Sequence, residues 1–220
     1  MRIDVWSDVV CPWCWIGKHR LRRALAMMGA DASGIQVHWH AFLLDPEAGT
    51  DPVPLREAYA RKFGGAQRAA QMLASTQATG RAEGLPFDFD RGQVRVTTLP
   101  AHRLLWLAAR EGDADPVAEA LFRAHFAEGR NLADPEVLVA AGAAGGLPGA
   151  RVRALLAGDE GEAEVRAQVA QAHAMGIRSV PTFVIGGRYA VQGAQAPEVL
   201  VQALRRAGLD PVAGADGRRS

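Results

Sequence analysis

Residues 11–14 of this 220-residue chain read Cys-Pro-Trp-Cys, between a predicted strand and a predicted helix. Residues 2–7 before them alternate polar and apolar side chains, which is typical of a half-buried strand. Residues 15–28 after them place apolar side chains on one helical stripe, and residues 35–41 alternate again. Proline at the first helical position is well tolerated, because the N–H that it lacks would have no partner there. The opening is therefore predicted as strand, helix, strand, with both cysteines at the amino end of the helix.

This position has a chemical consequence for the two cysteines. A helix N-terminus carries partial positive charge and unpaired N–H groups, and both favour a thiolate over a thiol. The thiolate is the reactive nucleophile, so we expect Cys11, as the solvent-facing member, to attack disulfides. Cys14 lies one turn deeper and can attack the resulting mixed disulfide to release the product. The pattern predicts a two-electron thiol–disulfide centre.

A zinc site is the alternative use of the same cysteines. His38 and His40 lie on one face of the second predicted strand and could complete a Cys2His2 set with Cys11 and Cys14. Natural zinc sites of this kind use a helical His pair with wider spacing, and a chain of this length needs no metal to fold. We therefore expect no metal, with both histidines on a polar strand face.

Composition excludes several classes of function. With 25 Lys+Arg against 24 Asp+Glu, the net charge of +1 offers no concentrated positive surface for nucleic acid. No stretch approaches the roughly 20 apolar residues of a membrane span, and the first eight residues lack the pattern of a secretory signal. Only two cysteines are present, so no disulfide framework supports the fold. We expect a cytoplasmic protein.

Strand patterns disappear after the second strand. Residues 45–161 are predicted as an all-helical insertion, with helices near 100–111 and 116–127 and a connecting loop at 85–90. Asp115 and Asp134, each followed by proline, are predicted N-caps of two of these helices.

The last part of the chain returns to a mixed pattern. A helix near 162–175 precedes a short buried strand at 183–185, a Gly-Gly hairpin turn and a returning strand at 189–193. A final helix is predicted over 196–208, closed by its terminal glycine, and residues 209–220 are expected to form a loose tail.

Three motifs together resemble a known family. Residues 11–17, residues 42–46 and the run Ser179-Val180-Pro181-Thr182-Phe183 are similar to the DsbA-like thioredoxin superfamily, within it to the cytosolic FrnE-like branch. The resemblance spans roughly residues 3–204. It implies an α/β thioredoxin-like fold built from residues 1–44 and 162–208, with residues 45–161 inserted as a helical domain.

The resemblance also implies roles for single residues. Cys11 would be the attacking cysteine, Cys14 the resolving one, and Pro181 a cis-proline that faces them. Val180 would offer its backbone to an extended substrate. Pro12 and Trp13 would line the substrate surface, because a tryptophan between the cysteines tends to point outward, where it can hold apolar segments.

The chain departs from the family at two places. Relatives commonly carry Asn where this chain has Thr97, before the helix that contains His102, so the function of that Asn is in doubt here. Some relatives have a second cysteine pair, which is absent. A lone helical histidine such as His102 is more often a structural partner than a catalytic group.

Two other functions stay open. A related branch of the fold, the kappa-class glutathione transferases and 2-hydroxychromene-2-carboxylate isomerases, has serine at the position of Cys11. The presence of both cysteines favours disulfide exchange, with protein or small-molecule thiols and disulfides as partners, glutathione among them as co-substrate, and no bound cofactor. The third class is a non-catalytic, chaperone-like module. The oligomeric state and the physiological substrate are not determined by the sequence.

Overall fold

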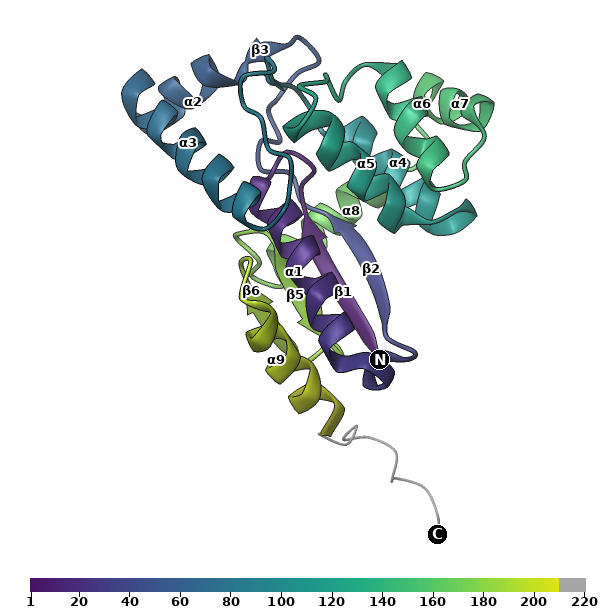
Figure 1. Cartoon of the computed structure of the whole chain (residues 1–220). Helices are drawn as coiled ribbons and strands as arrows, with labels where there is room; N and C mark the ends of the chain where they lie inside the picture. Colours follow the sequence, from purple (N-terminus) through teal and green to yellow (C-terminus); the bar gives the residue numbers. More distant parts are fainter. Residues whose placement is uncertain (210–220) are drawn as a thin grey trace.

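The computed structural model describes residues 1–209, which form a four-stranded sheet with helices on both faces and a helical region at one end (Figure 1). The strand order is β2-β1-β5-β6. β1 pairs in parallel with β2, and β5 pairs antiparallel with both β1 and β6. The strands are β1 (Arg2–Ser7), β2 (Gln36–Ala41), β5 (Thr182–Ile185) and β6 (Tyr189–Gln192).

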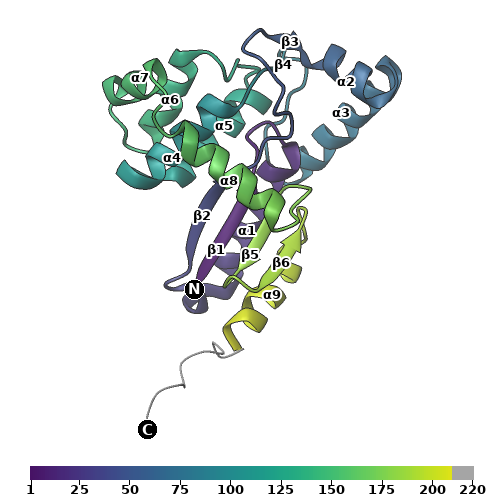
Figure 2. The same ribbon diagram turned by 180° about the vertical axis from the view of Figure 1, so that it is seen from behind.

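Three helices cover the sheet. α1 (Pro12–Met28) and α9 (Pro197–Leu209) lie side by side on one face, and α8 (Glu162–Ala174) crosses the other (Figures 1 and 2). A 3-10 turn, η1 (Gly29–Ala32), follows α1, and Gly29 ends that helix with a positive φ of 55°. Apolar side chains of β1, β5, α1 and α9 form a core of their own beneath these two helices. The predicted opening of strand, helix and strand is confirmed.

The inserted region contains most of the helices. Its elements are β3 (Val53–Pro54), α2 (Leu55–Phe63), α3 (Ala66–Ala82), β4 (Val94–Arg95), α4 (Leu99–Glu111), α5 (Ala114–Phe126), α6 (Pro135–Ala144) and α7 (Gly149–Ala157). α2 and α3 form one arm, and α4 to α7 form a bundle on the other side of the same end of the sheet (Figure 1). The predicted helices near 100–111 and 116–127 and the loop at 85–90 are confirmed.

The prediction that this region is all-helical is wrong in one respect. β3 and β4 form a two-stranded antiparallel ladder, in which Val53 pairs with Arg95 and Pro54 with Val94. Strands of two residues are too short to show alternation in a sequence. The ladder brings two segments that are distant in the sequence to the wall of one pocket.

The insertion and the thioredoxin-like part share a core. Trp15 of α1 is fully buried, and its ring lies 4.9 Å from that of Phe87, 6.3 Å from Phe122 and 6.0 Å from Phe126, measured between centroids. Its indole N–H donates to Glu119 at 2.9 Å. Burial of such aromatic rings contributes strongly to stability. Trp15, the residue next to Cys14, therefore packs α1 against the helical region.

Two predicted boundaries need correction. Asp134 caps α6 as expected, but the cap of α5 is Asp113, which accepts from the N–H of Asp115 at 2.9 Å. Asp115 lies inside the first turn of α5 and pairs with the buried Lys18 at 2.9 Å. The last helix runs through Leu209 instead of ending at position 208, and residues 210–220 lie outside the described part of the chain. Among the helices of residues 1–209, none has the length and apolar character needed to cross a membrane.

Candidate active site

Cys11 is the N-cap residue of α1, at the end of the short loop that follows β1. Its backbone N–H donates to the carbonyl of Asp8 at 3.0 Å, and its carbonyl accepts from the N–H of Cys14 at 3.0 Å. No side-chain hydrogen bond caps the helix, and Pro12 at its first position has no N–H to satisfy. Both thiols are free. The predicted position of the pair at a helix N-terminus is confirmed.

The two sulfurs have different environments. Cys14 is 1% exposed and Cys11 is 5% exposed, so Cys11 is the more accessible, although the prediction that it faces solvent is wrong. The Val180 carbonyl covers it, because its thiol donates a hydrogen bond to that oxygen at 3.6 Å. Burial raises the pKa of the Cys14 thiol well above its usual range, and the neighbouring Cys11 raises it further. Cys14 therefore keeps its proton under conditions in which an ordinary thiol ionises.

The register between β1 and β5 determines where Val180 and Pro181, the second half of the site, lie. β5 runs antiparallel to β1, and Thr182 pairs with Trp6 near the end of β1. The two residues before β5 consequently lie beside the loop that leads to the cysteines. The Val180–Pro181 peptide bond is cis, as the family resemblance implied. The Pro181 carbonyl accepts from the N–H of Gly193 at 2.8 Å, which holds this segment against the end of β6.

The residues between the cysteines lie at the surface. Trp13 is 43% exposed, as predicted for a side chain that points outward from the helix start. Pro12 is half-buried at the first position of α1. An exposed apolar ring between the two cysteines gives the site a surface that apolar segments of a substrate can contact.

Asp8 links the active-site loop to the helical region. Its side chain is 1% exposed and accepts from the N–H of Leu44 at 2.8 Å, and its other oxygen lies 3.2 Å from Nε2 of His102. His102 thus contacts the loop before Cys11 and acts as a structural partner. The Thr97 hydroxyl accepts from the Leu99 N–H at 3.4 Å, so this side chain supports the start of α4.

The four residues of the zinc alternative do not come together. Nε2 of His40 lies 2.6 Å from a carboxylate oxygen of Asp4, and the His40 ring stacks on Trp6 at 4.6 Å. His38 pairs with Asp4 along the β1–β2 ladder. Over residues 1–209, the structure contains no group of three or more His, Cys, Asp or Glu side chains arranged to hold a metal ion.

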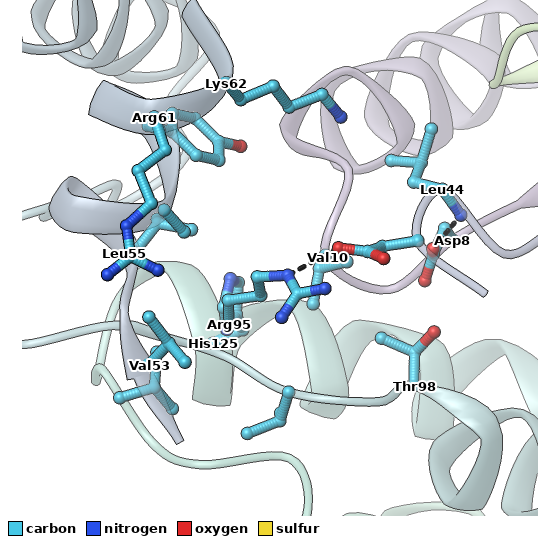
Figure 3. A pocket seen from close by; sticks show the side chains of 15 residues that line it. Asp8, Val10, Leu44, Val53, Leu55, Arg61, Lys62, Arg95, Thr98 and His125 are labelled. Atoms are coloured by element: carbon cyan, nitrogen blue, oxygen red, sulfur yellow. Dashed lines mark hydrogen bonds and ion pairs between the residues drawn. The ribbon is translucent and has the colours of Figure 1, made fainter. Parts of the chain in front are cut away.

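A pocket of about 480 Å³ opens beside the loop that leads to Cys11. Val10, the residue before Cys11, forms part of its wall, and His125 of α5 lies at its floor (Figure 3). Side chains of α2 and of the β3–β4 ladder form the opposite side. The lining residues are Asp8, Val10, Leu44, Asp45, Val53, Leu55, Ala58, Tyr59, Arg61, Lys62, Val94, Arg95, Val96, Thr98 and His125.

The arrangement of two cysteines beside a cis-proline agrees with a comparison of the whole chain with known protein families. Residues 2–205 match the family described as DSBA-like thioredoxin domain. The chain belongs to the DSBA-like thioredoxin family. Its fold is that of the family, with the inserted helical region that the sequence predicts.

Solved structures give the same fold. A probable DsbA oxidoreductase from Streptomyces coelicolor is 35% identical, with a TM-score of 0.90 over 98% of this chain and 94% of that one. The cytosolic disulfide reductase DsbM from Pseudomonas aeruginosa, solved also with GSH, is 24% identical, with a TM-score of 0.59 over 94% and 96%. A 2-hydroxychromene-2-carboxylate isomerase is 15% identical, with a TM-score of 0.64 over 94% and 95%. At the last two identities the likeness concerns the fold alone.

Sequence reasoning found the DsbA-like cysteine pair and the proline loop but missed the pocket. Tyr59 and His125 were not singled out, because α2 and α5 are far from the cysteines in sequence. Burial raises the pKa of Tyr59 to about 12, and the charges of Cys11 and Asp8 add to the rise. Tyr59 lines the same pocket as Asp8 and Val10. The basic residues 61 and 62 in the last turn of α2 gave no distinctive signal, because such residues are favoured at helix C-termini.

Proposed function

We propose that this DsbA-like protein is a thiol–disulfide oxidoreductase in which Cys11 attacks and Cys14 resolves. The observation that carries the proposal is the different burial of the two sulfurs at one helix N-terminus. Cys14 is deeper and holds its proton, whereas the Cys11 thiol, which also hydrogen-bonds with Cys14, donates to the Val180 carbonyl at 3.6 Å. A substrate strand that pairs with Val180 would replace this contact and bring its sulfur to Cys11.

The exchange proceeds in two balanced steps. The Cys11 thiolate attacks one sulfur of a substrate disulfide, forms the Cys11–substrate bond and expels the other substrate sulfur as a thiolate, which takes up a proton. Cys14 then loses its proton, attacks Cys11 and expels the second substrate thiol. The protein dithiol is oxidised to the Cys11–Cys14 disulfide, and the substrate disulfide gains two electrons. Two molecules of an external thiol return the protein to the dithiol form and are themselves oxidised to a disulfide, and we propose glutathione for this step in a reducing, cytoplasmic setting.

DsbM, which is a cytosolic disulfide reductase solved also with GSH, supports this choice of thiol and compartment. The proposal keeps Pro12 and Trp13 as the substrate-binding surface and Pro181 as the residue that shapes the loop beside Cys11. The FrnE-like branch is also part of the proposal; it is supported by the three sequence motifs that resemble it, although the second cysteine pair of some relatives is absent.

Insulin reduction by dithiothreitol tests the proposal. The wild-type chain is expected to accelerate precipitation of the insulin B chain, and Cys11→Ser is expected to abolish the acceleration. A glutathione-dependent isomerase or transferase would be inactive in this assay and would keep its small-molecule activity in Cys14→Ser. A chaperone-like module would suppress aggregation equally well in Cys11→Ser. Absence of acceleration by the wild-type chain would overturn the oxidoreductase proposal.

A further inference from the structure

The pocket beside Cys11 holds positive charge that the exchange chemistry does not use. Lys62 at its mouth forms no ion pair with any carboxylate in residues 1–209. In Figure 3 its side chain reaches across the opening, above Arg95. Arg95 uses its Nε for Asp45, and within the described chain its two terminal amino groups have no other hydrogen bond. The third cation, Arg61, is paired with Glu57.

The two carboxylates that line the pocket already have hydrogen-bond partners. Asp8 accepts from the N–H of Leu44 and contacts His102, and Asp45 is held by Arg95. The Arg95 guanidinium holds the pKa of Asp45 below its usual value, so this carboxylate stays ionised and balances one cation. The charge of Lys62 also lowers the pKa of Asp45, and its Nζ lies 5.8 Å from the centre of the Phe63 ring, but within residues 1–209 Lys62 has no carboxylate at ion-pair distance.

The floor of the pocket presents a polar atom without a partner. His125 is 1% exposed, and its buried Nδ1 has no hydrogen-bond partner in the structure. Buried polar atoms of this kind are rare, because leaving one unpaired costs about 1–3 kcal/mol. Burial lowers the pKa of His125 to about 4, so its ring is neutral at pH 7 and can donate or accept a hydrogen bond. Between the floor and the mouth, the walls are mainly apolar: Val10, Leu44, Val53, Leu55, Val94 and Val96.

We propose that this pocket binds a low-molecular-weight disulfide or thiol whose apolar substituent ends in a carboxylate. The carboxylate would lie between Lys62 and Arg95, and the substituent would run along the apolar wall to place its sulfur at Cys11. The volume of about 480 Å³ is that of a typical small-molecule site. This inference rests on the proposed function, since the bound sulfur reacts by the same exchange: Cys11 forms the mixed disulfide and one carboxylate-bearing thiol leaves.

The limited access to Cys11 supports a small substrate. Because Cys11 is only 5% exposed, a slender disulfide held in the adjacent pocket reaches its sulfur more readily than a folded chain does. Cations that recognise a carboxylate by charge-assisted hydrogen bonds add specificity at the far end of such a ligand.

Two matched disulfides test the proposal: 4,4′-dithiodibutyrate and its dimethyl ester, which share the same aliphatic chain and differ in charge. The rate at which each forms a mixed disulfide with Cys11 is measured by intact-mass spectrometry in the Cys14→Ser background, where the product accumulates. Lys62→Met and Arg95→Met are each expected to lower the acid-to-ester rate ratio about tenfold, as loss of one charge-assisted contact predicts. Arg22→Met is the control, because Arg22 is exposed on α1 and does not line the pocket.

An unchanged ratio in Lys62→Met would overturn the inference, and so would an equal loss of rate for acid and ester. Lys62 is exposed, so its replacement does not endanger the fold. If neither compound reacts with Cys11 while the wild-type chain still reduces insulin, the proposed function stands and the pocket is judged by calorimetry. The unreactive thioether 4,4′-thiodibutyrate is then expected to bind the wild-type chain about tenfold more tightly than Lys62→Met, and absence of binding would overturn the inference.

Discussion

Gly17 of α1 lies so close to Pro181 that a Cβ atom at position 17 would stand 2.8 Å from the Pro181 Cγ and 3.2 Å from the Phe183 Cζ. The contact falls one turn after Cys14, on the face of α1 that meets the proline loop. It sets how closely the redox helix can approach the segment whose carbonyl bonds to Cys11. A glycine here serves the geometry of the site at the expense of helix propensity.

Gly17→Ala is therefore expected to destabilise the protein, although alanine is the better helix former by about 1 kcal/mol. The added methyl group must displace the Pro181 ring or α1, and overpacking of this kind costs about 1–3 kcal/mol. Insulin reduction should slow as well, because the Val180 carbonyl moves relative to Cys11. Gly208→Ala is the matched control: no atom lies within 4 Å of a Cβ at that helical position, so stability should rise slightly. Urea unfolding of both variants measures the difference, and equal behaviour would contradict the steric argument.

The two cysteines should react with alkylating agents at very different rates. In the reduced protein at pH 7, iodoacetamide is expected to modify Cys11 well before Cys14, because Cys14 is buried and its pKa is raised. Cys14→Ser should in turn accumulate mixed disulfides on Cys11 during substrate turnover. Peptide mass spectrometry after timed quenching gives both results, and preferential labelling of Cys14 would reverse the assigned roles.

Burial of His125 should make the protein sensitive to acid. Its pKa is about 4 in the folded chain, against about 6.5 for an unperturbed histidine. Between these values the unfolded chain binds the extra proton, so stability is present above pH 6.5 and is lost as the pH falls toward 4. The contribution is about 2–3 kcal/mol.

The matching experiment compares urea midpoints at pH 7, 6, 5 and 4 for the wild-type chain and His125→Asn. The variant should lose less stability over this interval, since it cannot take up the proton. His173→Gln, at an exposed position of α8, is the control and should follow the wild-type curve. Parallel curves for His125→Asn and wild type would show that His125 does not carry this effect.

Trp13→Ala should separate protein substrates from small ones. The side chain is 43% exposed, so unfolding free energy should change by no more than about 0.5 kcal/mol. Insulin reduction should weaken severalfold, mainly through KM, because an apolar contact to the polypeptide is lost. The reaction with 4,4′-dithiodibutyrate should keep its rate, since Trp13 does not line the pocket. Unchanged insulin kinetics would remove Trp13 from the substrate surface.

Local sequence was sufficient for the redox helix. Alternation over residues 2–7 and the proline at position 12 each report on backbone geometry within a few residues, so the strand and the helix start were predictable. The same applies to the cap of α6 at Asp134. At the start of α5, two aspartates two residues apart offered the same local signal, and Asp113 was missed because the sequence does not show which of them leaves the helix.

The amino-acid sequence by itself determined where the Cys-x-x-Cys pair lies, because the strand before it and the helix that it begins are local patterns of neighbouring residues. Only the tertiary structure decided what surrounds that pair. Asp8 meets His102 across 94 positions of sequence, Cys11 meets Val180 across 169, and the pocket combines α2, the β3–β4 ladder and α5. Periodicity shows which side chains are buried but not which partners bury them, since many packings satisfy the same apolar pattern. Which of these distant residues come into contact is determined by the packing of the whole core.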